Sequence, residues 1–63
     1  MTNGQRLRSH LAERGTKISW FAGHIHCSHQ ALTTWMEGRS KPQPIFREVI
    51  DRATDGAVPK DGW

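Results

Sequence analysis

The stretch ISWFAGHIHCSHQALTTWMEGRSKP, residues 18–42, predicts two short helices joined by a tight turn. Over residues 17–25, apolar residues recur at helical spacing. One face of this helix carries Ile18, Phe21, Ala22 and Ile25, and the other carries Trp20, Gly23 and His24. Ser28 is a good N-cap for a second helix, which is expected to run to about Glu37 before Gly38. Helices this short are marginal in water, so both must be held by packing.

The second helix has an outer face with few of the charges that usually solvate a helix. At helical spacing, Ala31, Leu32 and Trp35 lie inward. The outward side chains are Gln30, Thr33, Thr34 and Glu37, with His29 at the N-terminal flank. Two helices separated by about two residues, His26 and Cys27, have the outline of a helix-turn-helix. In that motif the second helix lies in the DNA major groove, where its N-terminal residues reach base edges.

Further helices are expected on both sides of this pair. The first covers residues 3–14, with Thr2 as N-cap, Gly15 past its end, and Leu7 and Leu11 on its apolar side. The last covers residues 44–54 and is expected to bury Ile45, Phe46, Val49, Ile50 and Ala53. In the tail, residues 57–63, Val58 and Trp63 can cover exposed core, or Trp63 can join a dimer contact. The chain is therefore predicted to be all-α: one domain, residues 1–63, forming a compact bundle of four to five short helices with a central helix-turn-helix over about residues 17–37.

Length and composition limit the class of protein. Sixty-three residues are near the smallest size at which one apolar core holds a chain folded. Cys27 is the only cysteine, which excludes a disulfide within the chain and fits a reducing cytoplasm. No apolar run approaches the roughly 20 residues that cross a membrane, and the N-terminus lacks the apolar segment of a signal peptide. We therefore expect a cytoplasmic protein without a membrane partner.

The charge is unevenly distributed along the chain. The net charge is +3: residues 1–42 hold six Lys and Arg against two acids, which gives +4, whereas residues 43–63 hold three against four, which gives −1. A basic portion beside a nearly neutral one indicates a polyanion-binding face. Ordinary solvation of a small surface explains the same charges equally well.

Residues 18–42 carry a family resemblance. Phe21 and Ala22 stand where a Leu-Ala pair is usual, Cys27 follows the turn as a small apolar residue, and Leu32 is the apolar residue of the second helix. The ending with Trp35, Gly38-Arg39 and Pro42 fits the pattern W-x-x-G-x-x-x-P, and the stretch IDRATDGAVPKDGW is similar to the ending A-T-G-G-x-V. In these features the chain resembles the Cro/phage-repressor (XRE-like) helix-turn-helix regulators, which implies a lambda-repressor-like fold and DNA binding. It departs from them at His26, where the family has glycine, and at Ile18, where it often has a polar residue.

The resemblance and the helix faces together predict the residues that meet DNA. In the family, the two residues after the N-cap serine commonly face bases, and Thr33 and Thr34 share the outward face with the second of them. The base-contacting residues are therefore expected to be His29, Gln30, Thr33 and Thr34. Phosphate contacts are expected from residues that cap or flank the helix pair, namely Lys17, Ser28, Arg39, Ser40 and Lys41.

The cluster HIHCSH, residues 24–29, holds three histidines and one cysteine, which are common zinc and copper ligands. A structural zinc site usually takes ligand pairs from separated segments, and only His10 remains as another ligand of that type. Side chains at i and i+2, such as those of His24 and His26, also diverge on a helix. Cys27 is expected in the core, where a free cysteine behaves as a small hydrophobe. We therefore expect a turn here, with no metal and no cofactor.

Two classes of function follow. The first is a sequence-specific duplex-DNA-binding regulator, a phage or mobile-element repressor that binds an inverted repeat as a homodimer. The second is a small protein-interaction module that reuses the same fold, with Trp20 and the sparsely charged second helix as its hot spot. The alternative for Trp20 is that it covers the first helix. Catalysis has little support, because there is no glycine-rich phosphate loop and the six acids are scattered. Neither an enzyme nor a small-molecule ligand is expected.

Overall fold

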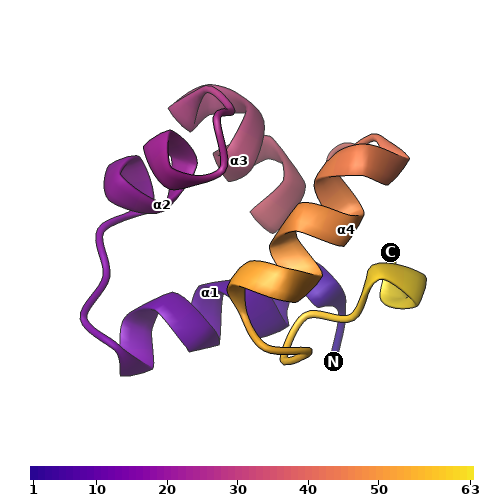
Figure 1. Ribbon diagram of the computed structural model, residues 1–63, viewed down its shortest axis with the longest axis horizontal. Helices are drawn as coiled ribbons and strands as arrows, with labels where there is room; N and C mark the ends of the chain where they lie inside the picture. Colours follow the sequence, from indigo (N-terminus) through magenta and orange to yellow (C-terminus); the bar gives the residue numbers. More distant parts are fainter.

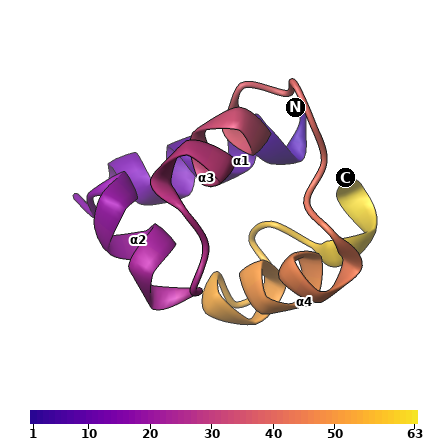
Figure 2. The same ribbon diagram turned by 90° about the horizontal axis from the view of Figure 1, so that it is seen from above.

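The computed structural model describes all 63 residues and contains four α-helices, one short 3-10 helix and no strand. The elements are α1 (Asn3–Glu13), α2 (Ile18–His24), α3 (His29–Met36), α4 (Pro44–Ala53) and η1 (Lys60–Gly62). In Figure 1, α3 lies at the top and α1 at the bottom, and in Figure 2, seen from above, α3 lies over α1. The predicted all-α bundle is confirmed.

Side chains cap two of the helices at their first turn. Before α1, the Thr2 hydroxyl accepts a hydrogen bond from the Gln5 amide (3.2 Å), and the Gln5 side chain accepts one from the Thr2 amide (2.9 Å). Before α3, the Ser28 hydroxyl accepts a hydrogen bond from the Ala31 amide (3.0 Å). Amides of the first turn have no partner inside the helix, so these caps stabilise the two starts that the sequence predicts.

The turn between α2 and α3 depends on a left-handed residue. His26 has φ of 61°, and its amide donates to the Gly23 carbonyl (3.3 Å). The Cys27 amide donates to the Ala22 carbonyl (2.9 Å), which completes a Schellman-type ending. Gly15 and Gly38 take the same left-handed conformation after α1 and α3. At His26 the conformation carries a steric cost that glycine avoids, although histidine tolerates it better than most residues.

One apolar core joins all four α-helices and the tail. Its buried members are Leu7, Leu11, Phe21, Ala22, Ile25, Leu32, Trp35, Met36, Ile50 and Val58. The expectation for Cys27 was partly wrong, because this residue is only half-buried against the core. The expectation for Ile45 was wrong, because its side chain is 66% exposed. Ile45 lies in the first turn of α4, at the edge of the apolar stripe whose centre is Ile50. No other helix covers that edge.

The tail is attached to the start of α1 rather than lying loose on the surface. Val58 is fully buried, and Trp63 packs partly against the core. The Asn3 amide group donates to the Pro59 carbonyl (2.6 Å) and accepts a hydrogen bond from Arg6 (2.8 Å). Asn3 is itself buried, so these hydrogen bonds satisfy polar atoms that have lost contact with water. Residues 56 positions apart in the chain are thereby joined.

α1 and α3 meet at a glycine. A methyl group added at Gly4 would lie 2.7 Å from the Met36 carbonyl oxygen and 2.8 Å from that of Trp35. The two backbones can therefore approach this closely only because residue 4 has no side chain.

No helix of the chain combines the length and apolar content that a bilayer crossing requires.

The Gly4 contact predicts opposite effects for two helical glycines. Gly4→Ala should destabilise the fold by about 1–3 kcal/mol, because backbone atoms of α3 must move to accommodate the methyl group. Gly23→Ala, in α2, should stabilise it by about 0.5–1 kcal/mol, because no atom lies within 4 Å of the added methyl group and alanine favours the helix. Chemical denaturation of the two variants measures both values. Changes in unfolding free energy of equal size and sign for the two variants would contradict the close approach of α1 and α3 at Gly4.

The left-handed turn predicts a stabilising substitution at the centre of the helix pair. His26→Gly should raise the free energy of unfolding by about 0.5–1 kcal/mol, because glycine adopts positive φ without the steric cost. Gly15→Ala is the matched reverse change: the space around Gly15 is open, so any loss is conformational. Thermal melting should shift upward for the first variant and downward for the second. A lower melting temperature for His26→Gly would show that the imidazole contributes more than its backbone costs.

Candidate nucleic-acid interface

The outer surface of α3 presents polar side chains that are free to meet a ligand. His29 and Gln30 are exposed at its N-terminal turn, and neither side chain makes a hydrogen bond within the chain. The opposite side of the helix is buried through Leu32, Trp35 and Met36. Burial of Met36 was not expected from the sequence. The α3 helix is therefore held from behind while its outer side stays open (Figure 2).

Thr33 and Thr34 are half-buried, and their hydroxyl groups are already engaged. The Thr33 hydroxyl donates to the His29 carbonyl (2.9 Å), and that of Thr34 donates to the Gln30 carbonyl (2.8 Å). Each hydroxyl proton is thus used inside the helix, and each oxygen keeps lone pairs that can accept. In this conformation these residues can accept from a base amino group or contact a thymine methyl, and they cannot donate to a phosphate.

Ser28 has the complementary arrangement. Its oxygen accepts the Ala31 amide, so its hydroxyl proton remains free to donate. A phosphate oxygen is an acceptor only, and it is therefore the group that an exposed capping serine can bind without giving up its cap. The geometry allows Ser28 to perform both roles that the sequence predicts for it.

The predicted phosphate-contacting cations lie on two sides of α3. Lys17 is exposed at the start of α2, and Arg39, Ser40 and Lys41 are exposed in the loop between α3 and α4. Figure 2 shows the start of α2 at the left and this loop at the right, with α3 between them. The Arg39 side chain, 77% exposed, lies 3.4 Å from the Glu37 carboxylate. An exposed pair of this kind is weak and leaves Arg39 available to a phosphate.

The loop that carries Arg39, Ser40 and Lys41 is held at both ends. Gly38 turns the chain out of α3 with φ of 79°. At the other end Pro42 is buried, and its carbonyl accepts a hydrogen bond from the Arg47 guanidinium (2.7 Å). These contacts restrict the loop to one path beside α3. Fixed cations lose less entropy when they bind an anion than mobile ones do.

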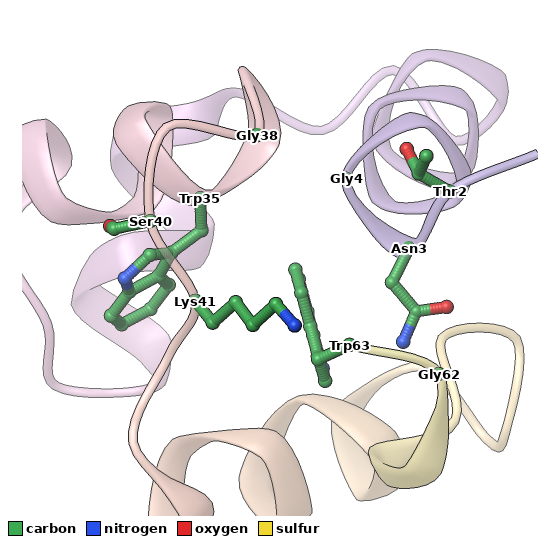
Figure 3. A pocket seen from close by; sticks show the side chains of 9 residues that line it. All are labelled: Thr2, Asn3, Gly4, Trp35, Gly38, Ser40, Lys41, Gly62 and Trp63. Carbon is green, nitrogen blue, oxygen red and sulfur yellow. The ribbon is translucent and has the colours of Figure 1, made fainter.

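A hollow of about 250 Å³ lies behind this loop. It is lined by residues of α1, α3, the loop and the tail: Thr2, Asn3, Gly4, Trp35, Gly38, Ser40, Lys41, Gly62 and Trp63. Figure 3 shows the Lys41 side chain extending toward the Trp63 indole. The Trp63 indole N–H is buried and has no hydrogen-bond partner. The loop, α3, the start of α1 and the tail therefore border one hollow.

The histidines of the HIHCSH cluster separate in the structure. His24 stacks on Trp20, with ring centroids 5.0 Å apart and an interplanar angle of 11°. His26 lies exposed in the turn, and His29 lies on α3. No group of three or more His, Cys, Asp or Glu side chains comes together to hold a metal ion. Burial raises the pKa of the Cys27 thiol, because desolvation disfavours the thiolate.

Comparisons of the chain with models of protein families, with curated proteins and with solved structures find no match. The resemblance of residues 18–42 to Cro-type regulators therefore stays a prediction.

Two contributors to the site could not be found from the sequence alone. Asn3 and Pro42 position the interface without lying on it: Asn3 joins α1 to the tail, and Pro42 anchors the loop. A buried asparagine in the first turn of a helix has no periodic signal. The sequence indicates Pro42 only as part of the family pattern, and it does not indicate that this residue anchors the loop.

The turn geometry predicts how the cluster responds to chelators and thiol reagents. Thermal unfolding should be the same with and without a strong chelator, because no ligand set links metal binding to folding. The Cys27 thiol should react with iodoacetamide more slowly than free cysteine near neutral pH, because its raised pKa leaves less thiolate. The rate difference should narrow as the pH rises past the thiol pKa. Chelator-induced melting would contradict the expectation that no metal supports the fold. Rapid alkylation of Cys27 at pH 7 would contradict the raised pKa of its thiol.

Proposed function

We propose that the protein is a sequence-specific duplex-DNA-binding regulator of the phage or mobile-element repressor type, acting in the cytoplasm. α3 enters the major groove, where His29, Gln30, Thr33 and Thr34 meet base edges. Lys17, Ser28, Arg39, Ser40 and Lys41 contact phosphates on either side. The observation that carries this proposal is a short helix whose outer side carries uncharged polar side chains, with cations on both flanks. His29 and Gln30 are exposed on that side, and Thr33 and Thr34 are half-buried.

The hydrogen-bonding pattern of this surface suits base recognition. Gln30 has a free amide group, which can pair with adenine through one donor and one acceptor. Thr33 and Thr34 offer oxygen acceptors and methyl groups, which match base amino groups and thymine methyls. Phosphates present acceptors only, so the donors expected to bind them are Ser28 and the cations. The groups that suit bases thus lie on the outer side of α3, and the donors that suit phosphates lie at its start and on its flanks.

The size of the chain favours a homodimer on DNA. Its extents are 25 × 21 × 20 Å, so one copy spans a single major-groove segment. Related two-fold binders place their recognition helices about 34 Å apart, one turn of the duplex. A second copy is therefore needed to occupy the next groove, and the operator would be an inverted repeat. Binding of such a dimer over a promoter would exclude polymerase.

Salt dependence tests the phosphate contacts. Log affinity should fall linearly with log salt, by about 0.9 per neutralised phosphate. Arg39→Ala should weaken all duplexes alike and flatten the slope by about one unit. Arg52→Ala is the matched control, because Arg52 is equally exposed (79%) and also pairs with a glutamate, but lies on α4. Fluorescence anisotropy titrations over a range of salt measure the slopes. An unchanged slope for Arg39→Ala would remove this residue from the interface.

Sequence discrimination tests the role of α3. The preferred duplex is obtained first, by selecting bound duplexes from a random pool. Gln30→Ala should then cost about 1–3 kcal/mol on that duplex and much less on random DNA, because only base contacts discriminate. Equal losses on both would show that Gln30 positions the protein without recognising sequence. Equal affinity of the unmodified protein for selected and random duplex, or no binding, would favour the protein-interaction module.

A further inference from the structure

Trp20 is the most unusual feature that DNA binding leaves unexplained. Its side chain is 61% exposed, while Phe21 and Ala22 beside it on α2 are buried. Helix geometry fixes this arrangement, because α2 cannot turn Trp20 inward without turning Phe21 out. Aromatic side chains offer about 150–250 Å² each for burial, and tryptophan is enriched among interface hot spots.

The indole is held in place before any partner arrives. His24, one turn further along α2, stacks on it with ring centroids 5.0 Å apart and an interplanar angle of 11°. A side chain restricted in this way loses little conformational entropy when it is covered. Tryptophan anchors that are rigid in the free protein are efficient contact residues for that reason.

Hollows that include Trp20 can receive side chains of a partner. One, of about 230 Å³, lies between α1, α2 and the end of α4, with Leu11, Phe21 and Ala53 among its lining residues. Another, of about 280 Å³, is formed by Trp20 with Gly15, Thr16 and Lys17. Each is smaller than the roughly 300–1,000 Å³ of pockets for drug-sized ligands. Their size fits single side chains of a polypeptide better than an independent small molecule.

The charges of this surface have one sign. The polar lining includes the cations Arg14 and Lys17 and the imidazoles of His10 and His24, with no carboxylate. The nearest carboxylate in sequence, Glu13, lines a neighbouring hollow on α1 with Arg6 and with His10, which borders both hollows. A partner with carboxylates around an apolar residue would therefore be complementary to Trp20 and its surroundings.

This surface is separate from the outer side of α3. In Figure 1, α3 lies at the top of the molecule, whereas α1 lies at the bottom and its connection to α2 runs along the left side. Lys17, at the start of α2, is the residue shared with the proposed phosphate contacts. A partner on Trp20 and Arg14 would therefore leave α3 available to DNA.

We propose that the surface formed by His10, Arg14, Lys17, Trp20 and His24 binds an acidic segment of a partner protein, with Trp20 covering an apolar side chain of that segment. Carboxylates of the segment pair with Arg14 and Lys17. The pairing speeds association and selects acidic partners, while the tryptophan contact supplies most of the affinity.

A random peptide library displayed on phage, selected on the full chain, tests this proposal. Enriched peptides should carry Asp or Glu around a Leu, Ile, Phe or Trp. A synthetic copy of the most enriched peptide should shift the tryptophan fluorescence of the protein to shorter wavelength, and Trp20→Ala should abolish that shift while Trp35 and Trp63 remain. The same substitution should lower the affinity at least about tenfold. Arg14→Glu should weaken binding and reduce its dependence on salt. Ile45→Ala is the matched control, since Ile45 is as exposed as Trp20 but lies on α4, and it should bind normally.

Each other outcome overturns the proposal. No enrichment, enrichment without acidic residues, or equal loss with Ile45→Ala would do so. Circular dichroism checks that Trp20→Ala is folded, and Arg14→Glu provides a second test that leaves the tryptophan in place. Trp20→Ala and Arg14→Glu should both retain base discrimination on the selected duplex. Loss of that discrimination would assign this surface to the DNA interface and overturn the proposal. Peptide binding without any duplex binding would refute the proposed DNA function alone.

Discussion

The backbone contact between α1 and α3 at Gly4 is the constraint on which the position of α3 depends. The carbonyl oxygens of Trp35 and Met36 occupy space beside Gly4 that a side chain at this position would need. This contact supports α3 at its C-terminal end, while the Ser28 cap and the His26 turn define its N-terminal end. A helix of eight residues has little stability of its own, so its orientation is determined by these three points together with the burial of Leu32, Trp35 and Met36 in the core. On its outer side, the His29 and Gln30 side chains then remain exposed and make no hydrogen bond within the chain.

The small size of the chain explains why both of its ends take part in the core. Ten buried apolar residues form the core, and one of them, Val58, comes from the tail. The Asn3–Pro59 hydrogen bond joins the start of α1 to that tail, and Trp63 packs beside it. In a domain this small the surface is large relative to the core, so a short tail contributes a large share of the burial. The attachment of the tail to α1 also places Gly62 and Trp63 behind Lys41, so the tail and the loop beside α3 line the same hollow.

The proposed DNA contacts differ in chemistry according to where each hydroxyl proton is used. In α3 the two threonines donate to the preceding turn and keep only acceptor capacity, whereas the capping serine accepts and keeps its proton. The difference follows from position: a cap residue meets unpaired amides, and an interior residue meets carbonyls. Groups with different recognition properties thus arise from similar side chains, at places that the helix itself defines.

Much of this protein follows from local sequence rules. The helix bounds agree with expectation to within one or two residues. Thr2 and Ser28 mark starts through hydrogen bonding, and Gly15 and Gly38 mark ends through backbone freedom. The inward stripes of α2 and α3 follow from helical spacing, and so does the exposure of Trp20 and Gln30. These features depend on neighbours within about one turn, which the sequence contains directly.

Other features were decided only by tertiary structure. Burial of Asn3, Gly4 and Met36 depends on which helix lies opposite, as does the exposure of Ile45. The hollow between α1, α2 and the end of α4 beside Trp20 also depends on how these helices meet. Helical periodicity specifies the direction of a side chain relative to its own axis. What lies in that direction is determined by contacts between residues distant in the chain, and those contacts leave no periodic pattern in the sequence.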